Sequence, residues 1–254
     1  MYYGLWAWRT VAREGRQPIA SMGAFKAKPP AGIDPVGASS AGASVYELIR
    51  EDIIEGRLAP NERLVVNDLA RRHGTSTNPV REALQILRGE GYVIISPNRG
   101  ARVRPIDQDF VRDIAEIGVL IEPVLTRWFV GMATQEDVAE LERLQGQIEE
   151  NNFADPLLHS ELDTAFHTVM YQRHYNRHAA ELWWKHREVL RAVGRRFNFT
   201  LARRAAVMRE HRELIAHVKA QDADKAAATI ERHVAGSGRH LVEQMRALAV
   251  ARAG

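Results

Sequence analysis

The sequence of 254 residues predicts a mainly α-helical protein, in which an N-terminal winged helix-turn-helix precedes an all-α helical bundle. Three observations predict this fold class. Three helical patterns and one hairpin pattern succeed each other within about 60 residues after Ser44. Beyond Pro105 the apolar spacing is helical for about 150 residues, without a convincing strand. The stretch 18–44 is rich in Pro, Gly, Ala and Ser and has no period. We therefore expect a flexible N-terminal tail over 1–43, a winged helix-turn-helix over 44–105 and a helical domain over 106–254.

Composition excludes several classes of protein. Hydrophobic residues make up 45% and charged residues 26% of the chain, as in ordinary globular proteins. Because the chain has no cysteine, it can form no disulfide, and a transition metal would need His and carboxylate ligands. No stretch approaches the ~18 apolar residues of a transmembrane helix. Arg9, Arg13 and Arg16 follow the N-terminal aromatic residues, which is the wrong order for a secretory signal. We expect a cytoplasmic protein without membrane contact.

Local signals bound the first two helices. Ser44 is a plausible N-cap for a helix that runs to Gly56 with its apolar residues on one face. A second helix is expected over 68–73, with Asn67 as its cap and Gly74 as its stop.

A third helix and a hairpin complete the first domain. The helix opens with Ser76 as a cap candidate and Pro79 in its first turn. Two short strands are expected over 92–96 and 101–104, because the residues 97–100 between them have hairpin-turn chemistry. Three helices and a hairpin of this length predict a winged helix-turn-helix.

The rest of the chain predicts a helical bundle with its own core. Thr134 and Asp155 have the side chains of helix starts, and Pro123 is expected to kink or divide the first of these helices. Gly, Pro, Asn or Asp residues separate the helical segments, which lie near 107–131, 134–150, 156–174, 178–199, 203–219 and 222–250.

Charge and spacing point to DNA binding by the first domain. The second helix of a helix-turn-helix lies in the major groove with its first residues at the base edges. Here that first turn carries Ser76, Thr77 and Asn78, and Arg81 lies one turn on. From 68 to 104, seven arginines against three acidic residues leave a charge of +4, although the whole chain carries only +3. The alternative is a charged module that mediates protein contacts.

Four residues of the helical domain predict a metal site. Asp163 and His167 are spaced i and i+4, on one helix face and within reach of a common ion. His211 and His233 follow on two later predicted helices. Three His and one Asp suit Zn²⁺, Ni²⁺, Mn²⁺ or Fe²⁺, and the spacing does not choose among them. Spacing alone also leaves solvated or packed roles open for these histidines.

Several motifs of the first domain are shared with a known family. They read Gly56-Arg-Leu-Ala-Pro60, Pro79-Val-Arg-Glu-Ala-Leu84, Glu90-Gly91-Tyr92 and Asn98-Arg-Gly100. At these residues the sequence resembles the GntR family of bacterial transcription regulators, which bind double-stranded operator DNA. The family commonly has Arg where this chain has Thr77, so we expect an altered operator sequence. With this resemblance, the DNA contacts are expected from Arg71, Ser76, Thr77, Asn78, Arg81, Arg99 and Gly100.

The second domain carries further motifs, from Glu116 to Glu122, from Asp163 to His167, and at His211 and His233. Here the chain is similar to the FCD effector domain of the FadR subfamily of GntR regulators. The resemblance implies that Asp163, His167, His211 and His233 ligate a metal. Many such domains have an Arg where this chain has Gly118, and that Arg pairs with a carboxylate effector. Another cation would have to take its role, with candidates Arg112, Arg173, Arg195 and Arg196.

Together the resemblances imply a homodimeric regulator. Residues 106–254 would form the effector-binding and dimerisation domain and would bind a small molecule, an organic acid, near the metal. The alternative is a metalloenzyme that acts on a small carboxylate and uses the winged helix as an interaction module. We expect no enzyme, because the sequence offers no extra general base such as a His-Glu-x-x-His helix provides.

Overall fold

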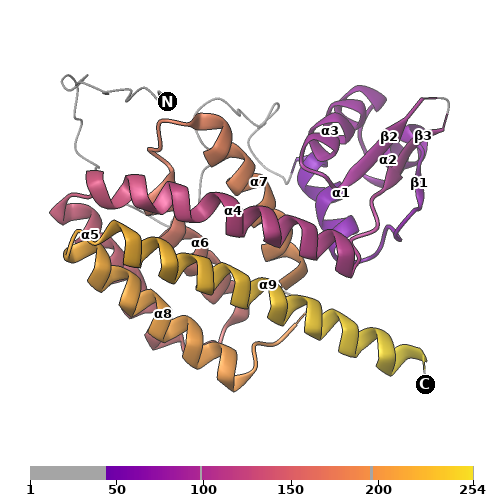
Figure 1. The fold of residues 1–254 in the computed structure, drawn as a ribbon. Helices are drawn as coiled ribbons and strands as arrows, with labels where there is room; N and C mark the ends of the chain where they lie inside the picture. The colour runs from indigo at the N-terminus through magenta and orange to yellow at the C-terminus, as the bar shows by residue number, and fades with distance from the viewer. Residues whose placement is uncertain (1–43, 98, 195–196, 254) are drawn as a thin grey trace, which may run out of the picture.

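The computed structural model describes residues 44–97, 99–194 and 197–253 (Figure 1). The tail expected over 1–43 and the candidate cations Arg195 and Arg196 lie outside the described residues. The described part is mostly helical with one small sheet, which confirms the predicted fold class. The winged helix contains α1 (Val45–Ile54), β1 (Arg63–Leu64), α2 (Val66–Arg72), α3 (Thr77–Gly89), β2 (Val93–Ser96) and β3 (Gly100–Val103). The helical domain contains α4 (Gln108–Met132), α5 (Gln135–Asn151), α6 (Pro156–Tyr171), α7 (Arg177–Gly194), α8 (Leu201–Lys219) and α9 (Ala223–Ala253).

Reciprocal side-chain bonds set the start of α1. The Ser44 hydroxyl accepts a hydrogen bond from the Glu47 backbone N–H, and the Glu47 carboxylate accepts one from the Ser44 N–H at 2.8 Å. The two bonds satisfy amide donors that a helix start leaves without intrahelical partners. The predicted cap at Ser44 is confirmed.

One local prediction in the winged helix is wrong, and one element was not predicted. α2 begins at Val66 with Val65 as its cap, so Asn67 lies inside the first turn and does not cap the helix. The reason is β1, which ends at Leu64 and leads directly into Val65 with extended backbone. The sequence does not predict β1, because two residues carry no alternation pattern.

The wing is a three-stranded antiparallel sheet with the order β1-β3-β2. In the register of β1 and β3, Arg63 lies opposite Arg102 and Leu64 lies opposite Ala101. Because successive side chains of a strand point to opposite faces, Leu64 and Ala101 are buried while the two arginines share the exposed face.

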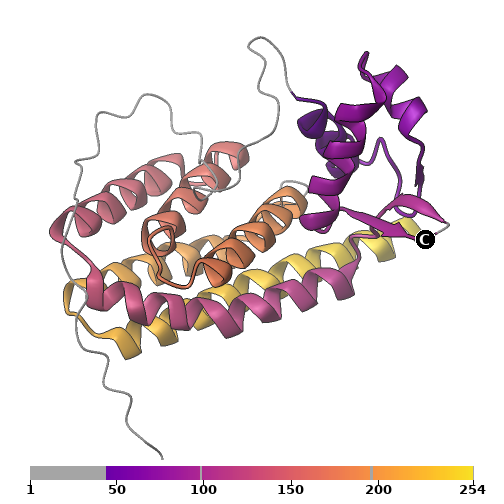
Figure 2. The ribbon, with the colours of Figure 1, turned by 90° about the horizontal axis from the view of Figure 1, so that it is seen from above.

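Two long helices, α4 and α9, run antiparallel side by side through the helical domain (Figures 1 and 2). Glycines allow this close approach. A Cβ at Gly118 would meet the side chain of Val234 at 3.1 Å, and a Cβ at Gly238 would meet that of Ala115 at 2.6 Å. Of the two outcomes expected for Pro123, a kink or a division of the helix, the division is wrong, because α4 continues through it. Packing along α9 offsets the loss of the one backbone hydrogen bond that a proline removes.

The two domains share part of a hydrophobic core. The apolar cluster that fills the winged helix continues into α4, α7 and α9 through Ile114, Val189, Val193 and Leu241. A second cluster lies between the helices of the helical domain. Among the described helices, none is both long and apolar enough to cross a membrane.

Candidate metal centre and DNA-binding face

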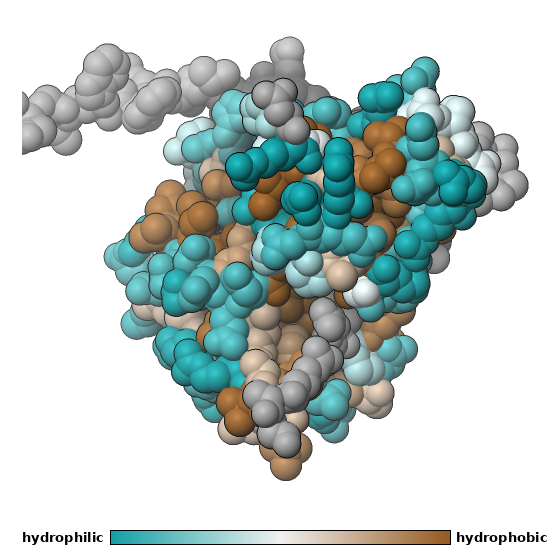
Figure 3. All heavy atoms as spheres, turned by 90° about the vertical axis from the view of Figure 1, so that its right-hand side faces the viewer, coloured by the Kyte–Doolittle hydropathy of each residue, from teal (hydrophilic) through white to brown (hydrophobic). Residues whose placement is uncertain are grey.

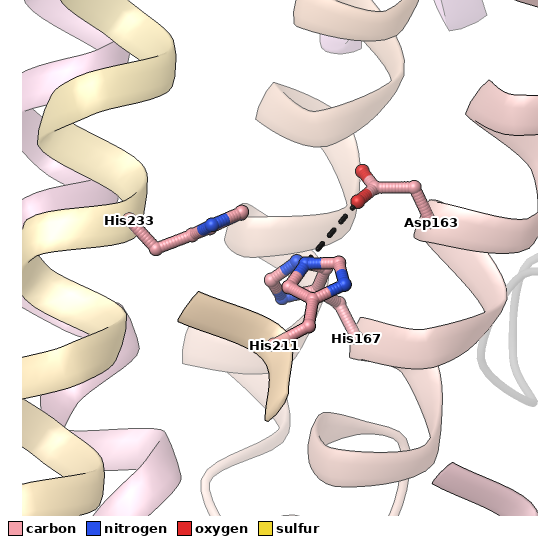
Figure 4. Close-up of side chains that lie close together, drawn as sticks. All are labelled: Asp163, His167, His211 and His233. Carbon is pink, nitrogen blue, oxygen red and sulfur yellow. Dashed lines mark ion pairs between the residues drawn. The ribbon is translucent and has the colours of Figure 1, made fainter. Parts of the chain in front are cut away.

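The four residues predicted as metal ligands come together from three helices. Asp163 and His167 project from α6, His211 from α8 and His233 from α9, and their side chains point toward one another (Figure 4). One donor atom from each residue lies within 4.8 Å of the others. His211 Nε2 is 3.5 Å from the Asp163 Oδ1 atom.

In two of the histidines, a neighbouring side chain determines which ring nitrogen is left to bind a metal. Gln145 Oε1 accepts a hydrogen bond from His211 Nδ1 at 2.9 Å, and its amide orientation is set because Gln145 Nε2 donates to Glu149 at 2.9 Å. Glu210 Oε2 accepts a hydrogen bond from His233 Nδ1 at 3.0 Å. Because Nδ1 carries the proton in both rings, each Nε2 keeps its lone pair for a ligand.

A buried arginine supports the second of these contacts. Arg203 Nη1 donates to Glu210 Oε2 at 3.1 Å, while Nη2 donates to the His233 carbonyl at 2.9 Å and to Ser237 Oγ at 2.7 Å. A Cβ at Gly236 would lie 2.6 Å from Arg203 Nη1, so the glycine makes room for the guanidinium. Although burial opposes ionisation, hydrogen bonds from His233 and Arg203 hold the pKa of Glu210 below its usual value.

Burial keeps the three histidines neutral, which is the state that binds metals. It lowers the pKa of His167 and His211 well below the usual value, and it also lowers the pKa of His233. Both ring nitrogens of His167 and the Nε2 of His211 are buried without a hydrogen-bond partner among the described residues. Unpaired buried polar atoms are costly, and a metal ion would satisfy them. Three imidazoles and one carboxylate therefore fit a divalent transition metal.

The carboxylate of the cluster has a cationic partner. Asp163 forms an ion pair with Arg187 of α7, and both side chains are mostly buried. Although burial opposes ionisation, the Arg187 guanidinium holds the pKa of Asp163 well below its usual range. Asp163 is therefore charged, as a metal ligand must be, and Arg187 brings a positive charge to the edge of the cluster.

A second carboxyl group borders the cluster. Glu122 Oε2 lies 3.6 Å from His167 Nδ1 and accepts a hydrogen bond from the Tyr171 hydroxyl at 3.2 Å. The same hydroxyl lies 2.9 Å from Thr126 Oγ1. Burial raises the pKa of Glu122 to about 7. Glu122 thus lines the site from α4 and is not one of the four predicted ligands.

A cavity of about 140 Å³ lies beside the cluster, and Asp163 and His233 form part of its wall. Gly118 lines it without adding a side chain. Histidines outside the predicted ligand set also face it, namely His159, His186 and His240. Among the described residues, the cations of its wall come from α7 and α8 and are Arg187, Arg191 and Arg204.

Two of the cations suggested by the sequence do not line the cavity. The side chain of Arg112 is 53% exposed and pairs with Asp109 at 2.8 Å, and that of Arg173 is equally exposed and pairs with a carboxylate of α5. Spacing could have indicated Arg187 instead, because it lies four residues after the buried Trp183 and on the same face of α7.

The predicted DNA-reading residues of α3 lie on its outer side. Ser76, Asn78 and Arg81 are exposed, and Thr77 is half-buried. Ser76 caps α3 by position, without a side-chain hydrogen bond among the described residues. The opposite side of α3 packs into the core through Val80, Ala83, Leu84 and Leu87.

The remaining predicted DNA contacts lie on α2 and the wing. Arg71 is exposed and pairs with Asp68 at 3.0 Å. Arg99 and Gly100 are exposed at the wing, where Gly100 has a φ of 72° that favours glycine. Seen from the winged-helix end, the surface is mostly hydrophilic with apolar patches between the polar side chains (Figure 3).

The structure adds two arginines to this face. Arg63 and Arg102 line a hollow on the wing together with Arg99 and Asn61. Arg102 also donates a hydrogen bond to the Asn61 carbonyl at 2.9 Å. Sequence reasoning missed this group, because it depends on the pairing of β1 with β3. Clustered arginines of this kind suit DNA phosphates.

Comparisons with known proteins agree with the two domains. The family of bacterial regulatory proteins called the gntR family matches residues 41–103, and the FCD domain matches residues 113–236. The HTH-type transcriptional regulator YdhC of Bacillus subtilis (strain 168) is 26% identical over 199 residues, which cover 77% of this chain and 88% of YdhC. The galactonate operon transcriptional repressor of Escherichia coli (strain K12) is 25% identical over 214 residues, which cover 76% and 93% of the two chains.

A solved structure, E. coli McbR/YncC, has the same fold. It matches with a TM-score of 0.62 and 20% identity over 79% of this chain and 96% of its own. The matched families and the curated relatives are transcription regulators, so the metalloenzyme alternative is not supported. GntR winged helices bind operator DNA and FCD domains bind small-molecule effectors. The chain belongs to the GntR family of bacterial transcription regulators and joins the DNA-binding winged helix of that family to an FCD effector domain.

Proposed function

We propose that this regulator binds a divalent transition metal through Asp163, His167, His211 and His233, and that a small carboxylate bound beside the metal changes its affinity for operator DNA. The observation that carries the proposal is the set of buried neutral histidines with unpartnered nitrogens beside a cavity. Zn²⁺, Ni²⁺, Mn²⁺ and Fe²⁺ all accept such nitrogen and oxygen ligands. The bound ion would supply open coordination positions toward the cavity, where a carboxylate oxygen can bind.

Arg187 is the cation that we assign to the effector carboxylate. It lines the cavity and its charge lies next to Asp163. A guanidinium recognises a carboxylate through paired hydrogen bonds, so it can take the role for which Gly118 offers no side chain. The name of one relative supports an acid as effector. That repressor is named for the galactonate operon, and galactonate is a carboxylate.

We also propose that the regulator acts as a homodimer, with α4 at the contact. Leu120 and Val124 on α4 are 74% and 56% exposed. Glu116 and Arg127 lie on the same face, on either side of this apolar pair. In an antiparallel pairing, Glu116 would come near Arg127 of the partner subunit, so the face is complementary to itself, as two-fold symmetry requires. A two-fold dimer suits an operator with two half-sites. Leu120→Glu should yield monomers in sedimentation velocity.

The test of the main proposal combines metal analysis with DNA binding. We expect the purified full chain to hold about one metal ion, to shift DNA from the intergenic region beside its own gene, and to change this affinity with organic acids. Asp163→Ala and His167→Ala should lose the metal and the acid response but keep DNA binding. The proposal is wrong if the folded protein binds no metal, or if both variants respond to acids like the wild type.

A further inference from the structure

Helix α7 contacts the effector cavity and the winged helix at the same time. Trp183, Arg187 and Arg191 recur at four-residue spacing and line the cavity. Val189 and Val193, on another side of the same helix, belong to the apolar cluster that fills the winged helix. A change at the cavity therefore has a direct mechanical route to the DNA-binding domain.

One carboxylate joins the two sides of α7. Glu188 Oε2 accepts hydrogen bonds from Arg191 Nη2 at 2.8 Å and from Arg50 Nη2 at 3.0 Å, and Glu188 Oε1 accepts one from Arg191 Nε at 3.0 Å. Arg50 belongs to α1 of the winged helix. The three side chains are only 16–19% exposed, so solvent screens these ion pairs weakly. The Tyr92 hydroxyl donates to the Glu188 carbonyl at 3.4 Å and adds a second link to the winged helix.

The geometry of Arg191 leaves room for an anion. Arg191 donates to Glu188 through Nε and Nη2, so in the described structure its Nη1 stays available to a ligand in the cavity. Arg191 lies one helical turn beyond Arg187, and both line the cavity. Asp163, which pairs with Arg187, and His233 form one part of the cavity wall, whereas Leu190, also in its wall, packs against the winged-helix core.

We propose that Arg191 is a second anion-binding residue of the cavity, that the effector is a dicarboxylate, and that its second carboxylate competes with Glu188 for Arg191. Glu188 then loses its bidentate partner, and its ion pair with Arg50 is no longer held in place. The contact between α7 and α1 loosens, and the winged helix changes its position on the helical domain. This inference rests on the proposed function, because it assumes that the first carboxylate binds at the metal and Arg187.

The binding part is tested with matched acids on the zinc-loaded full chain. Malonate, succinate, glutarate and adipate are titrated calorimetrically against propionate, butyrate, valerate and hexanoate. We expect the best dicarboxylate to bind at least tenfold more tightly than the monocarboxylate of equal length. Arg191→Met should abolish this advantage, whereas Arg177→Met, an exposed arginine of the same helix, should keep it. An advantage below tenfold, or one that survives Arg191→Met, overturns the proposal.

The coupling part is tested by backbone hydrogen exchange of α1. The best dicarboxylate should speed exchange in residues 45–54 of the wild type, and it should have no such effect on Arg191→Met. Glu188→Gln and Arg50→Met should both show fast exchange in α1 without any acid, because each breaks the same link. Slow exchange in α1 of both variants contradicts the coupling. An exchange rate of α1 in the wild type that does not change when dicarboxylate binds contradicts it as well.

The two proposals can fail separately. Zinc-dependent binding of monocarboxylates supports the proposed function on its own. If dicarboxylates then bind no better, the role of Arg191 is overturned and the proposed function stands. If neither class binds to the zinc-loaded protein, both are contradicted.

Discussion

The two domains bury polar groups in different ways. In the described winged helix, the buried charged side chain is Asp52. Its partners Arg57, Arg72 and His73 follow it closely in the sequence. In the helical domain, buried polar residues from α4, α5, α6, α8 and α9 meet at one cluster. The predicted DNA contacts of the first domain lie on its surface, whereas the candidate metal ligands of the second lie in its core. Changes at the two kinds of site should therefore have separable effects.

The largest separation between zinc affinity and DNA affinity is expected from removal of a buried residue that we propose as a ligand. His167→Ala deletes a cluster member that is fully buried and is expected to weaken zinc binding by more than the roughly 10- to 100-fold that outer-shell changes cost. DNA affinity without effector should stay near the wild-type value. Competition with a chromophoric chelator measures the zinc affinity, and fluorescence anisotropy measures the DNA affinity. His217→Ala on α8, outside the cluster, is the control and should keep zinc. Loss of DNA binding by folded His167→Ala would contradict the separation.

A smaller loss is expected when an orienting contact is weakened. Glu210→Gln keeps the shape of the side chain but removes the negative charge of the group that accepts the hydrogen bond from His233 Nδ1. Zinc affinity should fall about 10- to 100-fold, as for other outer-shell changes. Glu213→Gln on the same helix provides the matched control, because Glu213 pairs only with exposed arginines in the described structure. Equal zinc affinities for the two variants would show that Glu210 does not position His233.

Packing between α4 and α9 gives a test of stability. Gly238→Ala places a Cβ 2.6 Å from the Ala115 Cβ, so we expect overpacking to lower the free energy of unfolding by about 1–3 kcal/mol. Gly146→Ala on α5 meets no atom within 4 Å and should stabilise the helix by about 0.5–1 kcal/mol. Thermal denaturation of the metal-free proteins compares them. A Gly238→Ala protein as stable as the wild type would mean that the two helices can separate at no cost.

The smallest effect is expected on the DNA-binding face. Arg81→Met removes an exposed cation of α3, and if it contacts a phosphate, the slope of log affinity against log salt falls by about 0.9. Zinc affinity should not change. Arg88→Met, exposed in the last turn of the same helix, is the control. A salt slope unchanged in Arg81→Met would remove Arg81 from the phosphate contacts.

The fold was largely predictable where signals are local. The cap at Ser44, the Pro79 helix start and the wing hairpin are short-range features, and the structure has all three elements. The errors arise from tertiary contacts. β1 is too short to have a pattern, and its pairing with β3 moves the start of α2. Pro123 remains inside a helix because α9 packs along it.

The candidate site was predictable in part. Asp163 and His167 are close in sequence, and the structure brings His211 and His233 to them. The roles of Gln145 and Glu210 could not be predicted, because 66 residues separate Gln145 from His211 and 23 separate Glu210 from His233. Spacing places Arg187 and Arg191 on the face of α7 that carries the buried Trp183, but only packing determines that this face lines a cavity.

The register of the wing has a consequence for the response to ionic strength. Arg63 and Arg102 are directly opposite in β1 and β3, and like charges in such a pair repel. Added salt screens this repulsion, so the free wing becomes more stable as ionic strength rises. The same salt weakens a complex with DNA, whose phosphates would neutralise both arginines. Ionic strength therefore acts with opposite sign on the free wing and on the wing bound to DNA.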